Sequence, residues 1–323
     1  MKLLEELQTY LIEKNFSQLF LLVDENTSKY CMPILLEKVD EISNRGATLL
    51  EVKPMEENKT IQTAEDIIQS LLESNADRDS CMICLGGGMI TDLGGFVCSI
   101  YKRGIQNINI PTTLLSMVDA AIGGKTAVNF GGVKNAVGCF NFNSEVFVDT
   151  EFLSTLTIEQ IKDGIAEIVK TLLVSDTCFD IDKDLNLLND FIQTKDLKII
   201  HPFIDKCIEN KLSIVQKDPF DKGERKKLNF GHTLGHAVEM FYNLSHGHSV
   251  AVGMYYALDL SVKHANLGEE KANRIKDFIK QNFPLPDYQK DMPQLLRLMQ
   301  QDKKNKQGNI RFVLLEDIGK AIY

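Results

Sequence analysis

The hydrophobic pattern of this chain changes once, near residue 150, and that change restricts the folds open to it. Up to that point, apolar runs of strand length alternate with stretches in which apolar residues recur at helical spacing. Such alternation favours a parallel sheet with helices on both faces. The strand-like runs lie at 17–27 (ending in a polar turn), 47–53, 81–88, 107–110 and 145–148, and the helical stretches at 1–15, 34–44 and 63–74.

Beyond residue 150 almost all of the signal is helical, and only the run IRFVLL near the end looks extended. At 323 residues the chain is long enough for two domains, each with its own core. We therefore predict an α/β domain over residues 1–150 and a mostly helical domain over residues 151–323, with a site in the cleft between them. The helical stretches lie at 158–175, 197–216, 230–242, 250–265 and 269–281.

Charge and composition exclude several classes of protein. The net charge of −9 argues against a general nucleic-acid binder, although a local basic pocket could still hold an anion. The first fifteen residues carry Glu5, Glu6 and Glu13 among leucines, which predicts an amphipathic helix instead of a signal peptide. No stretch is apolar over the length of a membrane span, so we expect no membrane partner.

The seven cysteines are scattered and mostly set in apolar runs, which is typical of reduced thiols in a cytoplasmic protein. The single CxxC pair, Cys81 and Cys84, lies in a predicted strand, where residues three apart point to opposite faces. The chain has no second CxxC. We therefore expect neither a metal nor a redox role for this pair.

A glycine-rich turn follows the strand at 81–88. Gly86, Gly87 and Gly88 let backbone N–H groups approach a pyrophosphate, and the helix that follows favours negative charge at its N-terminus. This predicts a Rossmann-like parallel sheet that binds a dinucleotide, although GGGxxxD is not the GxGxxG fingerprint and a simple tight turn stays possible. Polar residues at other strand ends, Asp24 with Asn26 and Thr112 with Thr113, support the dinucleotide.

A second glycine-rich stretch, IGGKTAVNFGGVKN, spans 122–135 and carries Lys125, Lys134 and Asn135. Lysines among glycines suit a phosphate group. The structural alternative is a flexible loop with solvated lysines. Arg103 in YKRGI is likewise only a surface arginine when considered alone.

Four of the six histidines fall between Asn229 and Met254. His232 and His236 are spaced i, i+4, which places both rings on one side of a helix, and His246 follows a polar turn. Three such ligands with one open position make a catalytic zinc-type site. Ordinary hydrogen-bonded histidines are the alternative.

Taken in order, these motifs resemble those of the 3-dehydroquinate synthase family, over about residues 22–318. The specific runs are LGGGMITDLGGF, IPTTLLSMVDAAIGGKTAVN with GGVKNAVG, DGIAEIVK, and RKKLNFGHTLGHA with SHGHSVAVGM. The resemblance implies an α/β domain followed by a mostly helical one. It also implies NAD and a divalent metal, Zn²⁺ or Co²⁺, as cofactors.

The resemblance assigns roles residue by residue. It places the metal ligands at Glu167, His232 and His246, and gives His236 to phosphate binding and proton transfer, which replaces the pairing of His232 with His236. The substrate contacts that it implies are Asp119, Lys125, Asn135, Lys170, Lys211, Arg225, Asn229 and one lysine of the pair Lys303–Lys304. The NAD contacts that it implies are Asp24, Asn26, Glu56, Lys59, Gly87, Gly88, Asp92, Thr112, Thr113, Lys125, Lys134, Phe152, Thr155 and Leu156.

The activity implied is conversion of 3-deoxy-D-arabino-heptulosonate 7-phosphate to 3-dehydroquinate and phosphate, in the shikimate pathway of aromatic amino acid biosynthesis. It proceeds by transient NAD oxidation, phosphate elimination, re-reduction and intramolecular aldol closure. Arg103 matches an arginine that reaches the neighbouring subunit's site, so a homodimer is expected. The first alternative is another sugar-phosphate cyclase, whose substrate lacks the carboxylate and so would not need Lys211, Arg225 and Asn229. The second is a metal-dependent alcohol or glycerol-phosphate dehydrogenase, which would release NADH.

Some positions depart from the family's pattern. Ala120 and Ala121 stand where serines are usual, Ala127 where glycine is common, and Asp221 where glutamate is usual. His248 replaces a frequent glutamate. We expect His248 to face solvent or to support a ligand from outside the metal shell, with an additional ligand as the alternative.

Overall fold

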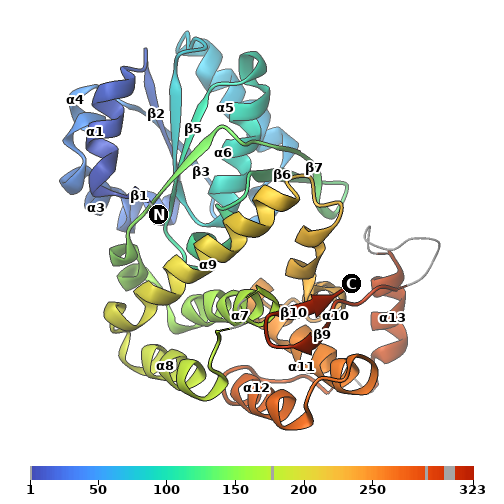
Figure 1. Cartoon of the computed structure of the whole chain (residues 1–323). Helices are drawn as coiled ribbons and strands as arrows, with labels where there is room; N and C mark the ends of the chain where they lie inside the picture. Colours follow the sequence, from blue (N-terminus) through green and yellow to red (C-terminus); the bar gives the residue numbers. More distant parts are fainter. Residues whose placement is uncertain (1, 176–177, 288–289, 302–309) are drawn as a thin grey trace. The chain divides into compact units, whose positions relative to one another are not determined.

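The computed structural model describes residues 2–175, 178–287, 290–301 and 310–323. The chain forms two compact units, which we call the N-terminal unit, Met1–Thr157, and the C-terminal unit, Ile158–Tyr323. Figure 1 shows strands and helices together in the first and mostly helices in the second. The fold class predicted from the sequence is therefore confirmed.

The N-terminal unit is built on a six-stranded sheet in which all neighbouring strands are parallel. Strands β2 (Leu19–Asp24) and β4 (Cys81–Gly86) are buried along their whole length, as expected for continuous apolar runs that are covered on both faces. In sheet order the strands are β1 (Lys2–Leu3), β8 (Ser144–Val148), β5 (Gln106–Pro111), β4 (Cys81–Gly86), β2 (Leu19–Asp24) and β3 (Thr48–Val52).

Helices lie on both sides of this sheet (Figure 1). On one side, α5 and α6 contribute Ile67, Leu93 and Val97 to the core. A Cβ at Gly94 would lie 2.2 Å from the Cys84 sulfur, so α6 approaches β4 closely. The helices are α1 (Glu5–Lys14), α2 (Glu25–Tyr30), α3 (Met32–Lys38), α4 (Asp40–Asn44), α5 (Ile61–Glu73) and α6 (Gly88–Ile100), with short 3-10 or π turns at Glu56–Asn58, Tyr101–Arg103, Ser116–Ala120 and Thr150–Thr155.

Two local predictions for this unit are wrong. The single helix expected over 34–44 is interrupted at Val39, whose φ of −131° and ψ of 80° are not helical. The polar turn expected after the first strand is the start of α2. There the Asp24 carboxylate accepts hydrogen bonds from the backbone N–H groups of Asn26 and Thr27, both at 2.9 Å, and so caps the helix.

The second glycine-rich stretch is not a loop but an antiparallel hairpin, β6 (Lys125–Phe130) and β7 (Val133–Phe140). Gly131 and Gly132 form its turn with φ of 59° and 76°, values that residues other than glycine rarely adopt. The two glycines therefore close a hairpin, which holds the lysines of this stretch on a defined backbone.

The C-terminal unit contains seven helices within the described residues and a hairpin at its end. Among the described residues, none of the helices has the length and apolarity needed to cross a bilayer. The elements are α7 (Ile158–Ser175), α8 (Ile181–Thr194), α9 (Leu197–Lys217), α10 (His232–Tyr242), α11 (His246–Ala265), α12 (Glu269–Asn282), α13 (Met292–Gln301), β9 (Leu314–Asp317) and β10 (Lys320–Ile322), with a 3-10 turn at Glu224–Asn229.

Helices α10 and α11 pack with their backbones almost in contact. A Cβ at Gly253 would lie 1.8 Å from the Gly231 carbonyl oxygen, and one at Gly235 would lie 2.9 Å from the Ser249 carbonyl oxygen. Only glycine fits such an approach, so these glycines determine how closely the two helices meet. Helix α11 also begins at His246, one turn earlier than the expected start at 250.

Candidate active site

Three side chains of the C-terminal unit form a group with the geometry of a metal site. Glu167 lies on α7, and His232 and His246 are the first residues of α10 and α11. One ligand atom from each lies within 4.8 Å of the other two. Nε2 of His246 is 3.4 Å and Nε2 of His232 is 3.8 Å from the same oxygen, Glu167 Oε1.

The sequence around His246 explains why it lies beside Glu167. A Cβ at Gly247 would lie 2.3 Å from Cα of Asp163, so the first turn of α11 presses directly on the backbone of α7. Asp163 also accepts hydrogen bonds from Ser245 Oγ at 2.6 Å and from the His248 N–H at 3.0 Å. Asp163 precedes Glu167 by about one helical turn, so these contacts with Asp163 place His246 beside Glu167.

Each imidazole is also held from its outer side. His232 Nδ1 lies 3.1 Å from the Phe230 carbonyl oxygen, and His246 Nδ1 lies 3.1 Å from Glu239 Oε2. Both acceptors hold a proton on Nδ1, which leaves Nε2 on the side of Glu167, where a metal ion would take the place of its proton. Burial lowers the pKa of His246, but the nearby carboxylates of Glu167 and Glu239 outweigh it and raise the pKa to about 10.

The donor set fits a divalent metal ion. Glu167 is fully buried, and neither of its oxygens accepts a hydrogen bond of good geometry from the described residues, although Lys170 Nζ forms an ion pair with Oε2. A buried carboxylate in this state is costly unless a cation compensates it. One carboxylate and two imidazoles with an open position are the ligands of many catalytic zinc sites.

Two further histidines lie next to this group but are not part of it. The ring centroid of His236 is 5.3 Å from that of His232 and 6.2 Å from that of His246. The ligand atoms that lie within 4.8 Å of one another belong to Glu167, His232 and His246, so the structure does not support the spacing-based expectation that His232 and His236 share an ion. His248 directs its Nε2 at the Pro284 carbonyl oxygen, 2.6 Å away, and not at the ligand group.

Several cations of the C-terminal unit are buried, which is rare for such side chains. Lys170 is 1%, Lys211 5% and Arg225 2% exposed. Arg225 is held by its surroundings: its Nη1 donates to the Pro219 carbonyl oxygen at 3.0 Å, and its backbone N–H donates to Asp218 Oδ2 at 3.0 Å. These cations give the unit buried positive charge suited to an anionic ligand.

Asn229 ends the 3-10 turn that also contains Arg225, and its side chain donates to the Lys226 carbonyl oxygen at 3.0 Å. Of the predicted substrate residues, Lys303 and the alternative Lys304 lie outside the described residues.

In the N-terminal unit, the strand order creates a ligand site at one edge of the sheet. Connections run from β2 outward to β3 in one direction and through β4 and β5 in the other, so the order reverses between β2 and β4. In open α/β sheets ligands bind beyond the carboxyl ends of the strands at such a reversal. Asp24 ends β2, and Gly86, which ends β4, pairs with Pro111 just before Thr112.

The glycine turn at this edge leaves little room for side chains. A Cβ at Gly87 would lie 3.0 Å from the Thr113 methyl group, and one at Gly88 would lie 3.1 Å from the Ala120 side chain. Gly88 begins α6, so its backbone N–H groups are at a helix N-terminus. This cradle fits the pyrophosphate of a dinucleotide.

Three predicted cofactor residues of the N-terminal unit form an ion-pair cluster around a buried lysine. Lys59 Nζ lies 2.9 Å from Glu56 Oε1 and 3.0 Å from Asp92 Oδ2, and Lys59 is only 3% exposed. Burial lowers the pKa of Lys59, but the charges of Asp92 and Glu56 outweigh it and raise the pKa. Asn129 of β6 donates to Glu56 Oε1 at 3.0 Å and so ties the hairpin to this cluster.

The remaining predicted residues of the N-terminal unit occupy different environments. Lys125, Lys134 and Asn135 are exposed on the β6–β7 hairpin, and Arg103 is exposed after α6. Asp119 is partly buried in the π turn before the hairpin. Phe152 and Leu156 are buried in the core around the last 3-10 turn, where Thr155 donates to the Phe152 carbonyl oxygen at 2.7 Å, and Asn26 is exposed.

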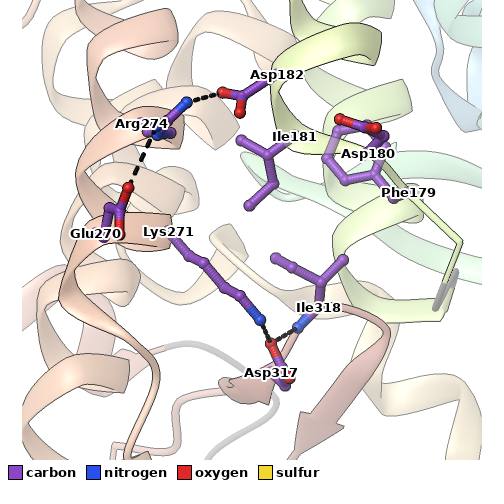
Figure 2. A pocket seen from close by; sticks show the side chains of 9 residues that line it. All are labelled: Phe179, Asp180, Ile181, Asp182, Glu270, Lys271, Arg274, Asp317 and Ile318. Carbon is purple, nitrogen blue, oxygen red and sulfur yellow. Dashed lines mark hydrogen bonds and ion pairs between the residues drawn. The ribbon is translucent and has the colours of Figure 1, made fainter.

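A separate hollow of about 410 Å³ on the C-terminal unit contains none of the predicted residues (Figure 2). It is lined by α8, α12 and the β9–β10 hairpin, and each of its two cations is already paired with acidic groups. Lys271 binds Asp317 at 2.6 Å, and Arg274 binds Asp182 and also Glu270, at 3.2 Å for the latter. We therefore place the active site elsewhere.

Two residues in contact with the predicted site had no assigned role. Glu239 lies seven residues after His232, a spacing that puts both on one face of α10 and that is visible in the sequence. Asn129 joins the hairpin to Glu56 through a tertiary contact, which no local pattern indicates.

The fold and the Glu–His–His group define a class, that of the dehydroquinate synthase-like enzymes, which includes sugar-phosphate cyclases. A solved structure of 2-deoxy-scyllo-inosose synthase, complexed with carbaglucose-6-phosphate, NAD⁺ and Co²⁺, is 26% identical with a TM-score of 0.84, covering 99% of this chain and 89% of that one. A 2-epi-5-epi-valiolone synthase from Streptomyces hygroscopicus with NAD⁺ and Zn²⁺ bound is 25% identical with a TM-score of 0.83, covering 97% and 88%.

Sequence comparison narrows this class. Residues 49–163 match the family described as 3-dehydroquinate synthase N-terminal, and residues 164–305 match 3-dehydroquinate synthase C-terminal. The 3-dehydroquinate synthases of Parabacteroides distasonis and Clostridium tetani are 39% and 37% identical, covering 97% and 99% of this chain and 89% and 84% of theirs. The chain belongs to the 3-dehydroquinate synthase family and is an enzyme of that family.

An iron-containing alcohol dehydrogenase from Thermotoga maritima is 13% identical with a TM-score of 0.61, covering 94% of this chain and 90% of that one. At this identity the likeness concerns the fold alone.

Proposed function

We propose that this enzyme converts 3-deoxy-D-arabino-heptulosonate 7-phosphate to 3-dehydroquinate and phosphate, with NAD and a divalent ion, Zn²⁺ or Co²⁺, as cofactors. The observation that supports it most directly is the buried Glu167 carboxylate with two imidazole Nε2 atoms directed at it. When bound, the ion polarises a substrate hydroxyl and NAD accepts and returns a hydride, so that no redox equivalent is consumed.

The metal ligands in this proposal are Glu167 Oε1 and the Nε2 atoms of His232 and His246. Lys170 follows Glu167 by one helical turn and is paired with its other oxygen, so its ammonium would lie next to the substrate oxygen at the ion. His236 lies beside the two ligand histidines and is a candidate for proton transfer and phosphate binding.

The substrate carries two anionic groups, and the proposal assigns a set of residues to each. Lys211 and Arg225 would bind the carboxylate, with the planar guanidinium making a bidentate contact, and Asn229 lies on the same 3-10 turn as Arg225. Lys125 and Asn135 would bind the phosphate together with His236. Asp119, Lys303 and the partner's Arg103 are further substrate contacts suggested by family resemblance.

NAD would bind to the N-terminal unit at the carboxyl edge of its sheet. The strand-order reversal and the close-packed glycine turn support this placement. The cluster of Glu56, Lys59 and Asp92 offers oxygens for ribose hydroxyls. The proposed contacts are Asp24, Asn26, Glu56, Lys59, Gly87, Gly88, Asp92, Thr112, Thr113, Lys125, Lys134, Phe152, Thr155 and Leu156.

The finer cellular and assembly features are also proposals. We infer a homodimer, which is supported by apolar side chains exposed on the β6–β7 hairpin: Phe130 at 62%, Val133 at 46% and Val137 at 37%. We infer a cytoplasmic location and a role in the shikimate pathway. The absence of any disulfide among the seven cysteines supports a reducing compartment.

One assay tests the proposed reaction. The purified enzyme is given NAD, Co²⁺ or Zn²⁺ and the heptulosonate phosphate, and phosphate and NADH are both followed. Phosphate release without accumulation of NADH is the expected result. Accumulation of NADH would instead indicate a dehydrogenase, and turnover of glucose 6-phosphate or sedoheptulose 7-phosphate in place of the heptulosonate would indicate a different cyclase.

A further inference from the structure

Glu239 is a buried carboxylate on α10 that touches a proposed metal ligand from the outer side. It is 9% exposed, and its Oε2 lies 3.1 Å from Nδ1 of His246. On its other side, the same imidazole places Nε2 3.4 Å from Glu167 Oε1. His246 is therefore held between two carboxylates, one inside the ligand group and one outside it.

The two ligand histidines differ in how their rings are fixed. His232 Nδ1 contacts the carbonyl oxygen of Phe230, only two residues earlier in the chain, so local backbone orients that ring. His246 begins α11, and the preceding Ser245 makes no side-chain cap to the helix; its hydroxyl donates to Asp163. The hydrogen-bond partner of the His246 outer nitrogen comes instead from α10, across the helix pair.

The charge of this partner also matters. A carbonyl oxygen and a carboxylate both select the tautomer with the proton on Nδ1, but the charged carboxylate makes the imidazole a stronger donor through Nε2 than a neutral carbonyl does. Two buried carboxylates flanking one imidazole also give the site negative charge that favours a divalent cation over a neutral ligand. The closely packed glycines of α10 and α11 keep Glu239 within reach of His246.

We propose that Glu239 is a positioning residue of the metal site, which orients His246 and sets the affinity for the ion without touching it. The inference rests on the proposed function, because it presumes that Glu167, His232 and His246 hold the ion. Removal of such outer carboxylates typically weakens metal binding by about 10- to 100-fold.

The test measures Co²⁺ affinity by competition with a chromophoric chelator in the absence of NAD and substrate. The variants are Glu239→Gln, which keeps the shape and a hydrogen-bond acceptor but loses the charge, and Glu239→Ala, which loses both. Glu159→Gln is the matched control, because Glu159 is exposed in the first turn of α7. Circular dichroism and melting temperature report whether each variant is folded.

We expect the Co²⁺ dissociation constant to rise by about 10-fold or more in Glu239→Gln, to rise further in Glu239→Ala, and to stay unchanged in Glu159→Gln. The visible absorption bands of bound Co²⁺ should shift in both Glu239 variants, which a purely structural role would not cause. If Glu239→Ala does not fold, the Co²⁺ affinity and spectrum of Glu239→Gln alone test the inference.

Wild-type affinity and an unshifted spectrum in folded Glu239→Gln would overturn the inference while leaving the metal site intact. If the wild-type enzyme itself binds no ion, the proposed function fails first, and the inference fails with it. The two failures are therefore distinguishable.

Discussion

At the scale of single residues, the buried charge of Glu167 indicates where a cation would bind. Its carboxylate is fully buried, yet it accepts no well-formed hydrogen bond from the described residues and instead faces Lys170 and two imidazoles. Such a group would destabilise the fold if nothing compensated its charge. Lys170 compensates the charge at Oε2, and a divalent ion at Oε1 would add to that compensation, so the local electrostatics favour metal binding.

Arg225 provides a test of substrate recognition at this scale. Arg225→Lys keeps the positive charge but loses the planar fork that matches a carboxylate. We expect KM for the heptulosonate phosphate to rise by roughly 10- to 100-fold, which corresponds to about 1.5–3 kcal/mol for hydrogen bonds to a charged group. Initial-rate kinetics over a range of substrate concentrations measure the change.

The control for this experiment is Lys217→Met. Lys217 is exposed on α9, so this substitution removes a positive charge that is not one of the buried cations. It should leave KM unchanged. An unaltered KM in Arg225→Lys would exclude bidentate binding of the substrate by this arginine.

Without the family resemblance, a residue's role could be predicted from sequence only where the spacing of similar residues indicated it. The HxxxH spacing indicated a metal site and paired His232 with His236, whereas the ligand atoms that lie close together in the structure belong to Glu167, His232 and His246. A single glutamate such as Glu167, inside the helix at 158–175, has no spacing signal. Only the resemblance of DGIAEIVK to a family motif indicated Glu167.

At the scale of elements, the pair α10–α11 determines where both histidine ligands lie. Each helix begins at its ligand histidine, and glycines allow the two backbones to meet. The close approach should therefore matter for stability as well as for the site.

Substitution of one of these glycines tests that packing. In Gly253→Ala the new methyl group would overlap the Gly231 carbonyl oxygen, so we expect a loss of about 1–3 kcal/mol or more in the free energy of unfolding. Gly268→Ala is the control, because no atom lies within 4 Å of a Cβ at that helix cap and its cost should stay below about 1 kcal/mol. Urea denaturation measures both; equal stability of the two variants would contradict the close packing.

The end of α10 supplies a prediction about pH. Burial and a 2.7 Å hydrogen bond to Asp291 raise the pKa of Tyr242 from 10.0 to about 12. An unfolded chain therefore loses this proton at lower pH than the folded chain does, so the contribution to stability is complete below pH 10 and is lost as pH rises toward 12. The melting temperature should fall more between pH 9.5 and 11.5, roughly this window, in the wild type than in Tyr242→Phe. Parallel curves for the two proteins would show that the hydrogen bond does not persist in solution.

Periodicity predicted several elements well, but it was not decisive everywhere: the amphipathic helices α8 and α13 were not predicted. The helix at 158–175 has the predicted bounds, because its apolar face repeats over five turns. The hairpin β6–β7 was missed because glycines and lysines hide its alternation. The first turn of α11 was missed because SHGHS has no apolar periodicity, and tertiary contacts with Asp163 stabilise it instead.

At the scale of the whole molecule, the two units carry different parts of the proposed chemistry. The N-terminal unit offers the strand-order reversal and glycine cradle for a dinucleotide. The C-terminal unit offers the Glu–His–His group and the buried cations. Similarity to both the N-terminal and the C-terminal family descriptions shows that each unit belongs to the same kind of enzyme.

The most direct test of the metal site compares the metal content of the wild-type enzyme with that of His246→Ala. Both proteins are loaded with Zn²⁺, dialysed and analysed by elemental mass spectrometry, with circular dichroism to verify folding. We predict one ion per chain in the wild type, and loss of both the ion and turnover in a folded His246→Ala variant. An unchanged metal content in that variant would show that Glu167, His232 and His246 do not form the metal centre.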